Sequence, residues 1–281
     1  MSSKEPFYPV AMTIAGSDSG GGAGIQADLR TFAAFGVYGT SAITAVTAQN
    51  PTAVTRIDAI PADGVTAQIK AVRTKFAVAA IKTGMLANAG IVKAVAAEIR
   101  KTQCPLVVDP VMISTSGARL LEEPAIELIR NELLPLAAWL TPNIHEAELL
   151  SGMKIASLAD MVAAGKYCAE RWQCSVIVKG GHMDFSDGLM TDVVIHEGKA
   201  LALTSPEVPD TEAGHGTGCT FSAALAAGFA LDGNWKQVVK TAKAFVYGSL
   251  EEEVVVGNGI HAMYPPLETY DAEINLKKID N

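Results

Sequence analysis

Gly214-His215-Gly216-Thr217-Gly218-Cys219-Thr220 leads directly into a run of small and apolar residues that ends at Leu231. The run predicts a helix over Thr217–Leu231, with its first turn inside the heptad. The first N–H groups of a helix lack intrahelical partners and its amino-terminal end is partially positive, so this turn would favour phosphate oxygens. The same field would lower the pKa of the Cys219 thiol. A structural alternative is a glycine turn before a buried helix, with Cys219 as a small core residue.

Strand-like and helix-like patterns alternate along the rest of the chain. Short β-branched and apolar runs predict strands over Val10–Ala15, Ser41–Thr47, Val54–Ile60, Ala77–Lys82, Leu106–Val108, Trp139–Thr141, Val176–Lys179, Val193–His196 and Ala200–Leu203. Longer segments predict helices over Ala23–Phe35, Asp63–Lys75, Ala89–Thr102, Pro124–Leu133, Ile144–Leu150, Leu158–Trp172, Thr217–Leu231 and Lys236–Leu250. We therefore expect an α/β fold of three layers, in which helices cover both faces of a mostly parallel sheet.

The chain shows no sign of division into separate units. It has no Gly-, Ser- or Pro-rich linker and no internal repeat, so residues 1–281 are expected to form one domain. The segment after Gly257 carries Pro265-Pro266 and many polar residues, and we expect it to be a looser tail.

The composition narrows the class of protein. Hydrophobic residues make up 49% and charged residues 19% of the chain, as in an ordinary globular protein. A net charge of −8 and the lack of a Lys/Arg-rich run argue against a nucleic-acid partner. No apolar stretch reaches the roughly 18 residues of a membrane span. The amino terminus lacks the apolar core of a secretion signal and the four cysteines form no CxxC pair, so we expect a cytoplasmic protein with reduced thiols.

Ligands of open α/β sheets bind at the carboxyl ends of the strands, and the first such loop, Gly16–Gly24, is rich in glycine. Glycines there would let the backbone approach a ligand closely. A Walker phosphate loop would end in Gly-Lys-Ser/Thr, and no such lysine follows here. A dinucleotide site would place an acidic residue about 20 residues onward. No Asp or Glu lies between Ala42 and Ile57, which argues against an NAD-linked oxidoreductase.

Three residues near strand ends suit an aromatic ligand. Gln49 offers both a donor and an acceptor to the edge of a heterocycle. Met85 could form a soft wall of the same pocket, and Asp28, one turn into the first helix, could point back at a ligand. Each also has a structural explanation: a polar turn, core packing and a solvated helix carboxylate, respectively.

Four residues suit phosphate and magnesium chemistry. Asp109 follows a buried strand and can act on phosphates through Mg²⁺, although an Asx-type turn into Pro110 is the alternative. Asn143 and Glu146 have the spacing of a helix capping box, and the same groups could hold the water shell of Mg²⁺. Lys179 precedes two glycines at a strand exit, where it could meet a nucleotide phosphate or simply extend into solvent.

These motifs, in this order, resemble those of the hydroxymethylpyrimidine/phosphomethylpyrimidine kinases of thiamine biosynthesis, which belong to the ribokinase-like superfamily alongside the pyridoxal kinases. The matching segments are 13–28, 43–50, 82–86, 109–112, 141–143 with Glu146, 179–182 and 215–220. Each motif is weak alone, but together and in register they are highly specific. The resemblance runs from about Val10 to about Leu250 and implies a single ribokinase-like domain.

The resemblance implies an enzyme that transfers the γ-phosphoryl group of ATP to the hydroxymethyl group of a pyrimidine, and then to the resulting monophosphate. It implies a pyrimidine pocket lined by Gly16, Asp28, Gln49 and Met85. It places Mg²⁺ and its waters at Asp109, Asn143 and Glu146, and Lys179 near ATP. It assigns the anion hole to Gly216, Thr217, Gly218 and Cys219. Many ribokinase-like kinases carry Asp as the base at the position of Cys219, and the family often forms homodimers.

Two other functions stay open at this point. A pyridoxal kinase, or a dual enzyme, would act on a similar hydroxymethyl-bearing heterocycle, and Gln49 and Met85 favour the pyrimidine by resemblance only. A vitamin-sensing binding protein on the same fold would use Cys219 as a redox switch without consuming ATP. The chain also departs from the family twice: Ala213-Gly214 replaces a frequent Asn-Thr, and Val256–Pro265 replaces a Gly-rich ending.

Overall fold

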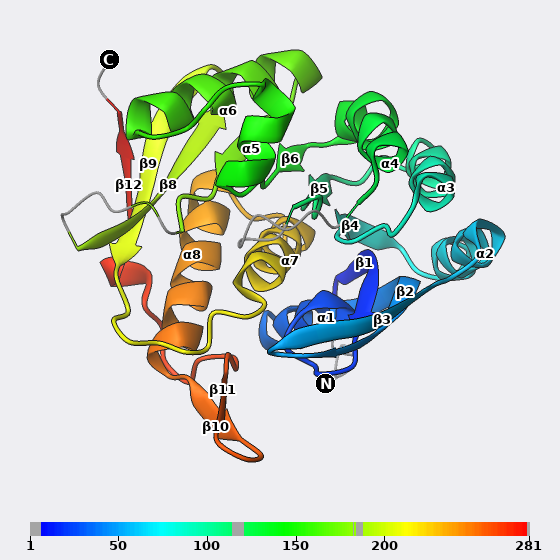
Figure 1. Ribbon diagram of the computed structural model, residues 1–281, viewed down its shortest axis with the longest axis horizontal. Helices are drawn as coiled ribbons and strands as arrows, with labels where there is room; N and C mark the ends of the chain where they lie inside the picture. The colour runs from blue at the N-terminus through cyan, green and yellow to red at the C-terminus, as the bar shows by residue number, and fades with distance from the viewer. Residues whose placement is uncertain (1–6, 114–120, 182, 184–187, 280–281) are drawn as a thin grey trace, which may run out of the picture.

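The computed structural model describes residues 7–113, 121–181, 183 and 188–279 of the chain. One ten-stranded sheet has the order β12-β9-β8-β7-β6-β5-β4-β1-β2-β3 (Figure 1). Its strands are β1 (Val10–Asp18), β2 (Tyr38–Asn50), β3 (Ala53–Ala59), β4 (Val78–Thr83), β5 (Leu106–Val108), β6 (Trp139–Leu140), β7 (Ser175–Val178), β8 (Leu189–His196), β9 (Lys199–Pro206) and β12 (Asn275–Lys278). Neighbouring strands from β7 to β2 are parallel, whereas the outer pairs are antiparallel.

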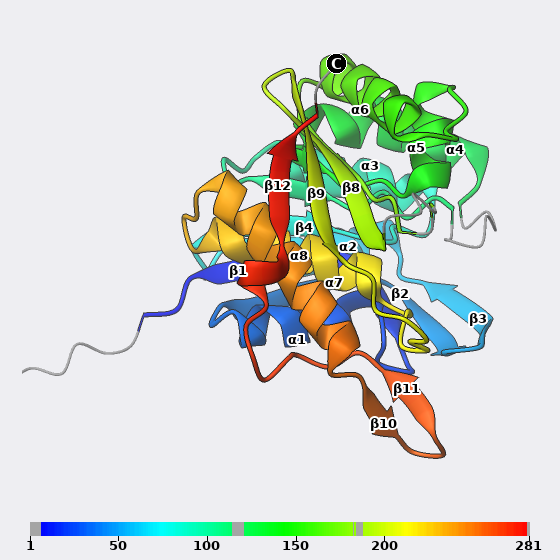
Figure 2. The same ribbon diagram turned by 90° about the vertical axis from the view of Figure 1, so that its left-hand side faces the viewer.

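Helices cover both faces of the sheet (Figures 1 and 2). One face carries α1 (Gly24–Ala34), α7 (Thr217–Ala230) and α8 (Trp235–Glu251). The other carries α2 (Ala62–Arg73), α3 (Ala89–Ile99), α4 (Glu123–Leu128), α5 (Ile144–Ser151) and α6 (Leu158–Trp172). In β5, Val107 packs towards the first group and its neighbours Leu106 and Val108 towards the second, which explains the continuous apolar run. The expected three-layer α/β architecture is confirmed.

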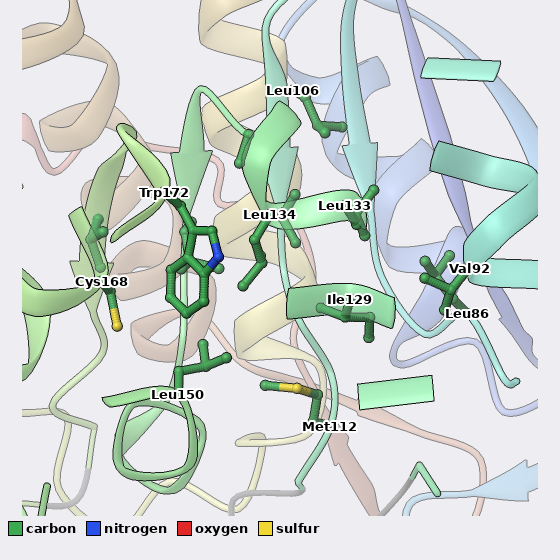
Figure 3. Close-up of a cluster of buried hydrophobic side chains, with 14 of the residues drawn as sticks. Leu86, Val92, Leu106, Met112, Ile129, Leu133, Leu134, Leu150, Cys168 and Trp172 are labelled. Carbon is green, nitrogen blue, oxygen red and sulfur yellow. The ribbon is translucent and has the colours of Figure 1, made fainter. Parts of the chain in front are cut away.

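The larger hydrophobic cluster lies between the sheet and helices α2 to α6 (Figure 3). Trp172 from α6 lies there with Leu134 and Leu150, and all three side chains are buried. The Trp172 indole N–H donates to the carbonyl oxygen of Arg130 at 2.9 Å, so its one polar atom is also satisfied. No helix in the described part of the chain is long and apolar enough to cross a membrane.

The two edges of the sheet differ from the sequence-based expectations. The run expected at Val54–Ile60 forms β3, an antiparallel edge strand in which every residue is exposed. Part of the segment expected to be a looser tail is also ordered: residues 275–278 form β12 and pair with β9. A separate hairpin of β10 (Val254–Val256) and β11 (Ile260–Ala262) projects from the body of the protein (Figure 2).

The order of the strands determines where a ligand can bind. Strands β1 and β4 are neighbours, but the chain continues from β1 to β2 on one side and from β4 to β5 on the other. The loops after β1 and β4 therefore leave the sheet in opposite directions and open a crevice at their carboxyl ends. Helix α7 packs across β1, β4 and β5, and its amino terminus reaches this crevice.

Candidate active site

The glycine loop after β1 and the turn before α7 are pressed against each other. Gly216 has φ of +89°, and a Cβ added there would lie 1.9 Å from the carbonyl oxygen of Gly22. A Cβ on Gly22 would in turn lie 2.6 Å from Cδ2 of His215. Only residues without side chains allow this approach, so glycine at 216 is required by both backbone conformation and space.

The amino terminus of α7 presents unpaired N–H groups to this junction. The helix begins at Thr217, as the sequence predicts, and its first backbone bond to the preceding turn runs from Thr220 N–H to the Gly216 carbonyl. Within the described residues, no protein acceptor satisfies the main-chain N–H groups of Thr217, Gly218 and Cys219. Such a turn favours an anion.

A lysine and a carboxylate lie beside these N–H groups. The Nζ atom of Lys179 is 3.1 Å from Oδ1 of Asp109, and the Ser222 hydroxyl donates to Oδ2 of Asp109 at 3.3 Å. A Cβ on Gly218 would lie 3.3 Å from that Nζ atom. Burial lowers the pKa of Lys179, but Asp109 and Glu146 raise it further, so the net shift is upward and the ammonium stays charged. Residues from β5, β7 and α7 thus form one cluster.

Asn143 and Glu146 form the capping box that their spacing predicts. The Asn143 side chain accepts from Glu146 N–H, and the Glu146 carboxylate accepts from Asn143 N–H, both at 2.9 Å. The second carboxylate oxygen accepts from Met112 N–H at 3.0 Å, which ties the α5 terminus to the loop after β5. Burial, opposed by Lys179, raises the pKa of Glu146 to about 7.

The carboxylates fit a water-rich magnesium site better than a protein cage. The described residues contain no group of three or more His, Cys, Asp or Glu side chains placed to hold a metal. Mg²⁺ keeps several waters and needs one or two carboxylates, which Asp109 and Glu146 supply. Both polar atoms of the Asn143 side-chain amide already have partners. Its oxygen accepts from Glu146 N–H, and its nitrogen donates to the Ile113 carbonyl at 3.0 Å. Its role towards Mg²⁺ would therefore be to orient Glu146.

The four residues assigned to the pyrimidine pocket lie near the end of β1 (Gly16), in α1 (Asp28), near the end of β2 (Gln49) and in the loop after β4 (Met85). A Cβ on Gly16 would lie 2.6 Å from Cε of Met85, so these two residues are in contact. The Gln49 amide lies 3.3 Å from Nε2 of His215, which is itself 3.0 Å from Oδ2 of Asp18. Neither His215 nor Asp18 is among the site residues predicted from the sequence. Their contacts connect the ends of β1 and β2 to the turn before α7.

Asp28 is fully buried and pairs with a lysine that the sequence analysis did not select. Nζ of Lys82 lies 2.8 Å from each carboxylate oxygen of Asp28, and the Thr13 hydroxyl also donates to this carboxylate. Neither charged side chain is exposed to solvent. The Lys82-Thr83-Gly84 motif marked this position, but the pairing partner is 54 residues away in sequence, so no local pattern indicates it.

The predicted direction of the Cys219 pKa shift is wrong. Burial raises the pKa of this thiol to about 11, because desolvation outweighs the favourable Lys82 charge and the hydrogen bond from Gly24 N–H. The sequence analysis considered the helix terminus alone, whereas the neighbours that bury the sulfur come from other elements. At neutral pH the Cys219 thiol is therefore neutral.

The buried Asp28–Lys82 pair beside Cys219 provides a test, because substitutions of its two members should change the alkylation rate of Cys219 in opposite directions. Asp28→Asn removes a negative charge, so we expect faster alkylation of Cys219 by iodoacetamide, whereas Lys82→Met should slow it, each by roughly tenfold at pH 8. Mass spectrometry of the peptide containing Cys219 measures both rates, with Cys104 as the internal control. Shifts of the same sign in both variants would contradict an electrostatic cause.

A family model described as phosphomethylpyrimidine kinase matches residues 18–264 of this chain. The chain belongs to the phosphomethylpyrimidine kinase family. The matched span contains the anion-binding turn, the Asp109–Lys179 cluster and the capping box, and of the proposed site residues only Gly16 lies outside it.

Individual relatives of the phosphomethylpyrimidine kinase family agree with this placement. A hydroxymethylpyrimidine/phosphomethylpyrimidine kinase of Haemophilus influenzae is 46% identical over 251 residues, which are 88% of this chain and 93% of that protein. The chloroplastic thiamine biosynthetic bifunctional enzyme TH1 of Arabidopsis thaliana is 41% identical over 91% of this chain and 49% of its own length. The structure of the pyridoxal kinase from Staphylococcus aureus in complex with AMP-PCP and pyridoxal superposes with a TM-score of 0.86 at 30% identity, over 98% of this chain and 100% of that one.

Proposed function

We propose that this protein phosphorylates 4-amino-5-hydroxymethyl-2-methylpyrimidine with ATP, and then phosphorylates the monophosphate to the diphosphate, in thiamine biosynthesis. The observation that carries this proposal is the convergence of the α7 amino terminus with Lys179 and Asp109, directly against the glycine loop after β1. An anion site beside an aromatic-ligand site is what phosphoryl transfer to a heterocyclic alcohol requires.

In the proposed reaction the substrate hydroxyl oxygen forms a bond to the γ-phosphorus, and the bond from that phosphorus to the departing ADP oxygen breaks. The hydroxyl proton moves to the sulfur of Cys219, which acts as a thiolate base. The N–H groups of Thr217 and Gly218 and the Lys179 ammonium stabilise charge on the transferring group. Mg²⁺, held through waters near Asp109 and Glu146, would supply further charge neutralisation.

A neutral resting thiol has a direct consequence for this mechanism. Because only the thiolate can accept the proton, the active fraction of the enzyme should grow as the pH rises towards the raised pKa of Cys219. We therefore propose that Cys219 is a poor base at neutral pH, and that Lys82, the Gly24 N–H and the α7 terminus are the groups that favour its thiolate.

Pyridoxal kinase activity is the second candidate, supported by the close structural match to the pyridoxal kinase described above. The higher identity to the pyrimidine kinase, 46% against 30%, favours the pyrimidine. A cytoplasmic location and a homodimer, implied by composition and by the resemblance, stay predictions, and analytical ultracentrifugation would test the second.

The deciding experiment is a coupled ADP-release assay with Mg-ATP, run separately with the hydroxymethylpyrimidine and with pyridoxal. We expect ADP release with the pyrimidine, and mass spectrometry should detect both its monophosphate and its diphosphate. If pyridoxal phosphate were the only product, the protein would instead be a pyridoxal kinase of vitamin B6 salvage. Ligand binding without ADP release would favour a vitamin-sensing protein instead.

A further inference from the structure

Besides the Asp28–Lys82 pair, another buried ion pair lies next to the turn formed by Lys179 and Gly180. Asp192 in β8 and Lys243 in α8 have side chains that are 7% and 11% exposed, and Lys243 Nζ lies 2.8 Å from Oδ2 of Asp192. Buried ion pairs often add less stability than apolar residues of the same volume, because removing two charges from water is costly. Stability alone is therefore a poor explanation for this pair.

The second oxygen of Asp192 binds the main chain of the loop. Gly180 N–H donates to Oδ1 of Asp192 at 2.9 Å in a buried setting. A Cβ on Gly180 would lie 1.9 Å from the carbonyl oxygen of Thr191, so the loop is pressed directly onto β8. The carboxylate thus has one oxygen on the loop and one on the lysine of α8.

Lys179, the residue before Gly180, is bound by a different segment of the chain. Lys179 N–H donates to the Pro142 carbonyl at 2.9 Å, in the turn before the α5 cap. The turn at 179 and 180 is therefore bound between the β6–α5 connection and β8. From this turn the Lys179 side chain reaches Asp109, 3.1 Å away.

We propose that Asp192, held by Lys243, is a positioning residue that fixes the turn at Gly180 and thereby aims the Lys179 ammonium at the nucleotide phosphates. This inference rests on the proposed kinase function. Asp192 does not touch the reacting atoms; it acts through the Gly180 N–H. Loss of this acceptor should therefore weaken nucleotide binding while leaving unchanged the proposed pyrimidine pocket, whose residues lie on β1, α1, β2 and the loop after β4.

Two double variants separate this role from simple stability. Asp192→Asn with Lys243→Met removes both charges but keeps an oxygen for Gly180 N–H. Asp192→Leu with Lys243→Met removes both charges and the acceptor. We expect the KM for ATP to stay within about threefold of wild type in the first and to rise at least about tenfold in the second, with the KM for the pyrimidine within twofold in both. Direct binding of Mg-ATP, measured by calorimetry, should show the same contrast without turnover.

The control is a partly buried ion pair far from the crevice. Glu98 in α3 pairs with Arg73 at 3.1 Å, at the amino-terminal end of β4, so Arg73→Met with Glu98→Leu should leave the KM for ATP unchanged. If Asp192→Leu with Lys243→Met does not fold, Asp192→Ala with Lys243→Met makes the same comparison.

Three outcomes would overturn the inference: an unchanged KM for ATP in the leucine variant, equal rises in both KM values, or equal effects of the asparagine and leucine variants. A wild-type protein that neither binds nor consumes Mg-ATP would instead refute the proposed function, so the two failures are distinguishable.

Discussion

Cys219→Ala is expected to lower kcat for pyrimidine phosphorylation by about 10²- to 10⁴-fold, the usual contribution of a positioned general base. The anion-binding N–H groups are main-chain atoms and Lys179 is untouched, so binding of Mg-ATP should change little. Cys219 is partly buried, its thiol accepts a hydrogen bond from Gly24 N–H, and alanine fits the helix, so the variant should fold. Steady-state kinetics and thermal melting measure both expectations.

Cys219→Asp is the matched comparison, because many ribokinase-like kinases carry Asp at the corresponding position. An aspartate there should restore a substantial part of the activity that alanine removes. The two bases also differ in pH dependence. With the raised thiol pKa of about 11, wild-type kcat/KM should increase by close to tenfold per pH unit from pH 7 to 9, whereas the aspartate variant should be nearly flat over this range. Alanine activity within tenfold of wild type would rule out Cys219 as the proton acceptor.

Gly216→Ala is expected to reduce both stability and kcat/KM, the latter by at least about 10²-fold. Alanine at φ of +89° costs roughly 1–2 kcal/mol, and its Cβ would lie 1.9 Å from the Gly22 carbonyl oxygen, so the two loops must separate. A displacement of about 1 Å in catalytic groups is enough for a loss of this size. Thermal melting and kinetics with both substrates report the two effects.

Gly152→Ala is a control that separates the cost of the positive φ from the cost of pushing the two loops apart. Gly152 ends α5 with φ of +73°, but a Cβ there would meet nothing within 4 Å. This control should lose about 1 kcal/mol of stability and no activity. If Gly216→Ala behaves like Gly152→Ala, contact between the two loops does not matter for catalysis.

Features that depend on neighbours in sequence could be predicted without the structure. The helix at Leu158–Trp172 has the predicted bounds, and the predicted Thr217–Leu231 differs from the observed helix by one residue. The capping box of Asn143 and Glu146 follows from their three-residue spacing, because the groups that it satisfies lie within one helical turn. Strand–helix alternation predicted the parallel sheet for a similar reason, since crossover connections constrain neighbouring strands.

Features that depend on distant neighbours could not be predicted. The exposed edge position of β3 and the addition of β12 to the other edge follow from the order of strands, which the apolar patterns do not encode. The Asp28–Lys82 pair joins residues 54 apart, and the Asp192–Lys243 pair joins residues 51 apart. No periodicity connects such positions, so the sequence shows each residue without its partner.

Cys219 has one property that follows from neighbours in sequence and another that follows from neighbours in space. The sequence by itself determined the fold class, the family and the location of the thiol at a glycine-rich helix terminus, because these depend on local pattern and motif order. Only the tertiary structure decided the protonation of that thiol: packing of α7 against α1 and β4 removes water from the sulfur, and the desolvation outweighs the Lys82 charge and the Gly24 hydrogen bond. Desolvation is the sum of all surrounding atoms, and those atoms come together only in the folded chain.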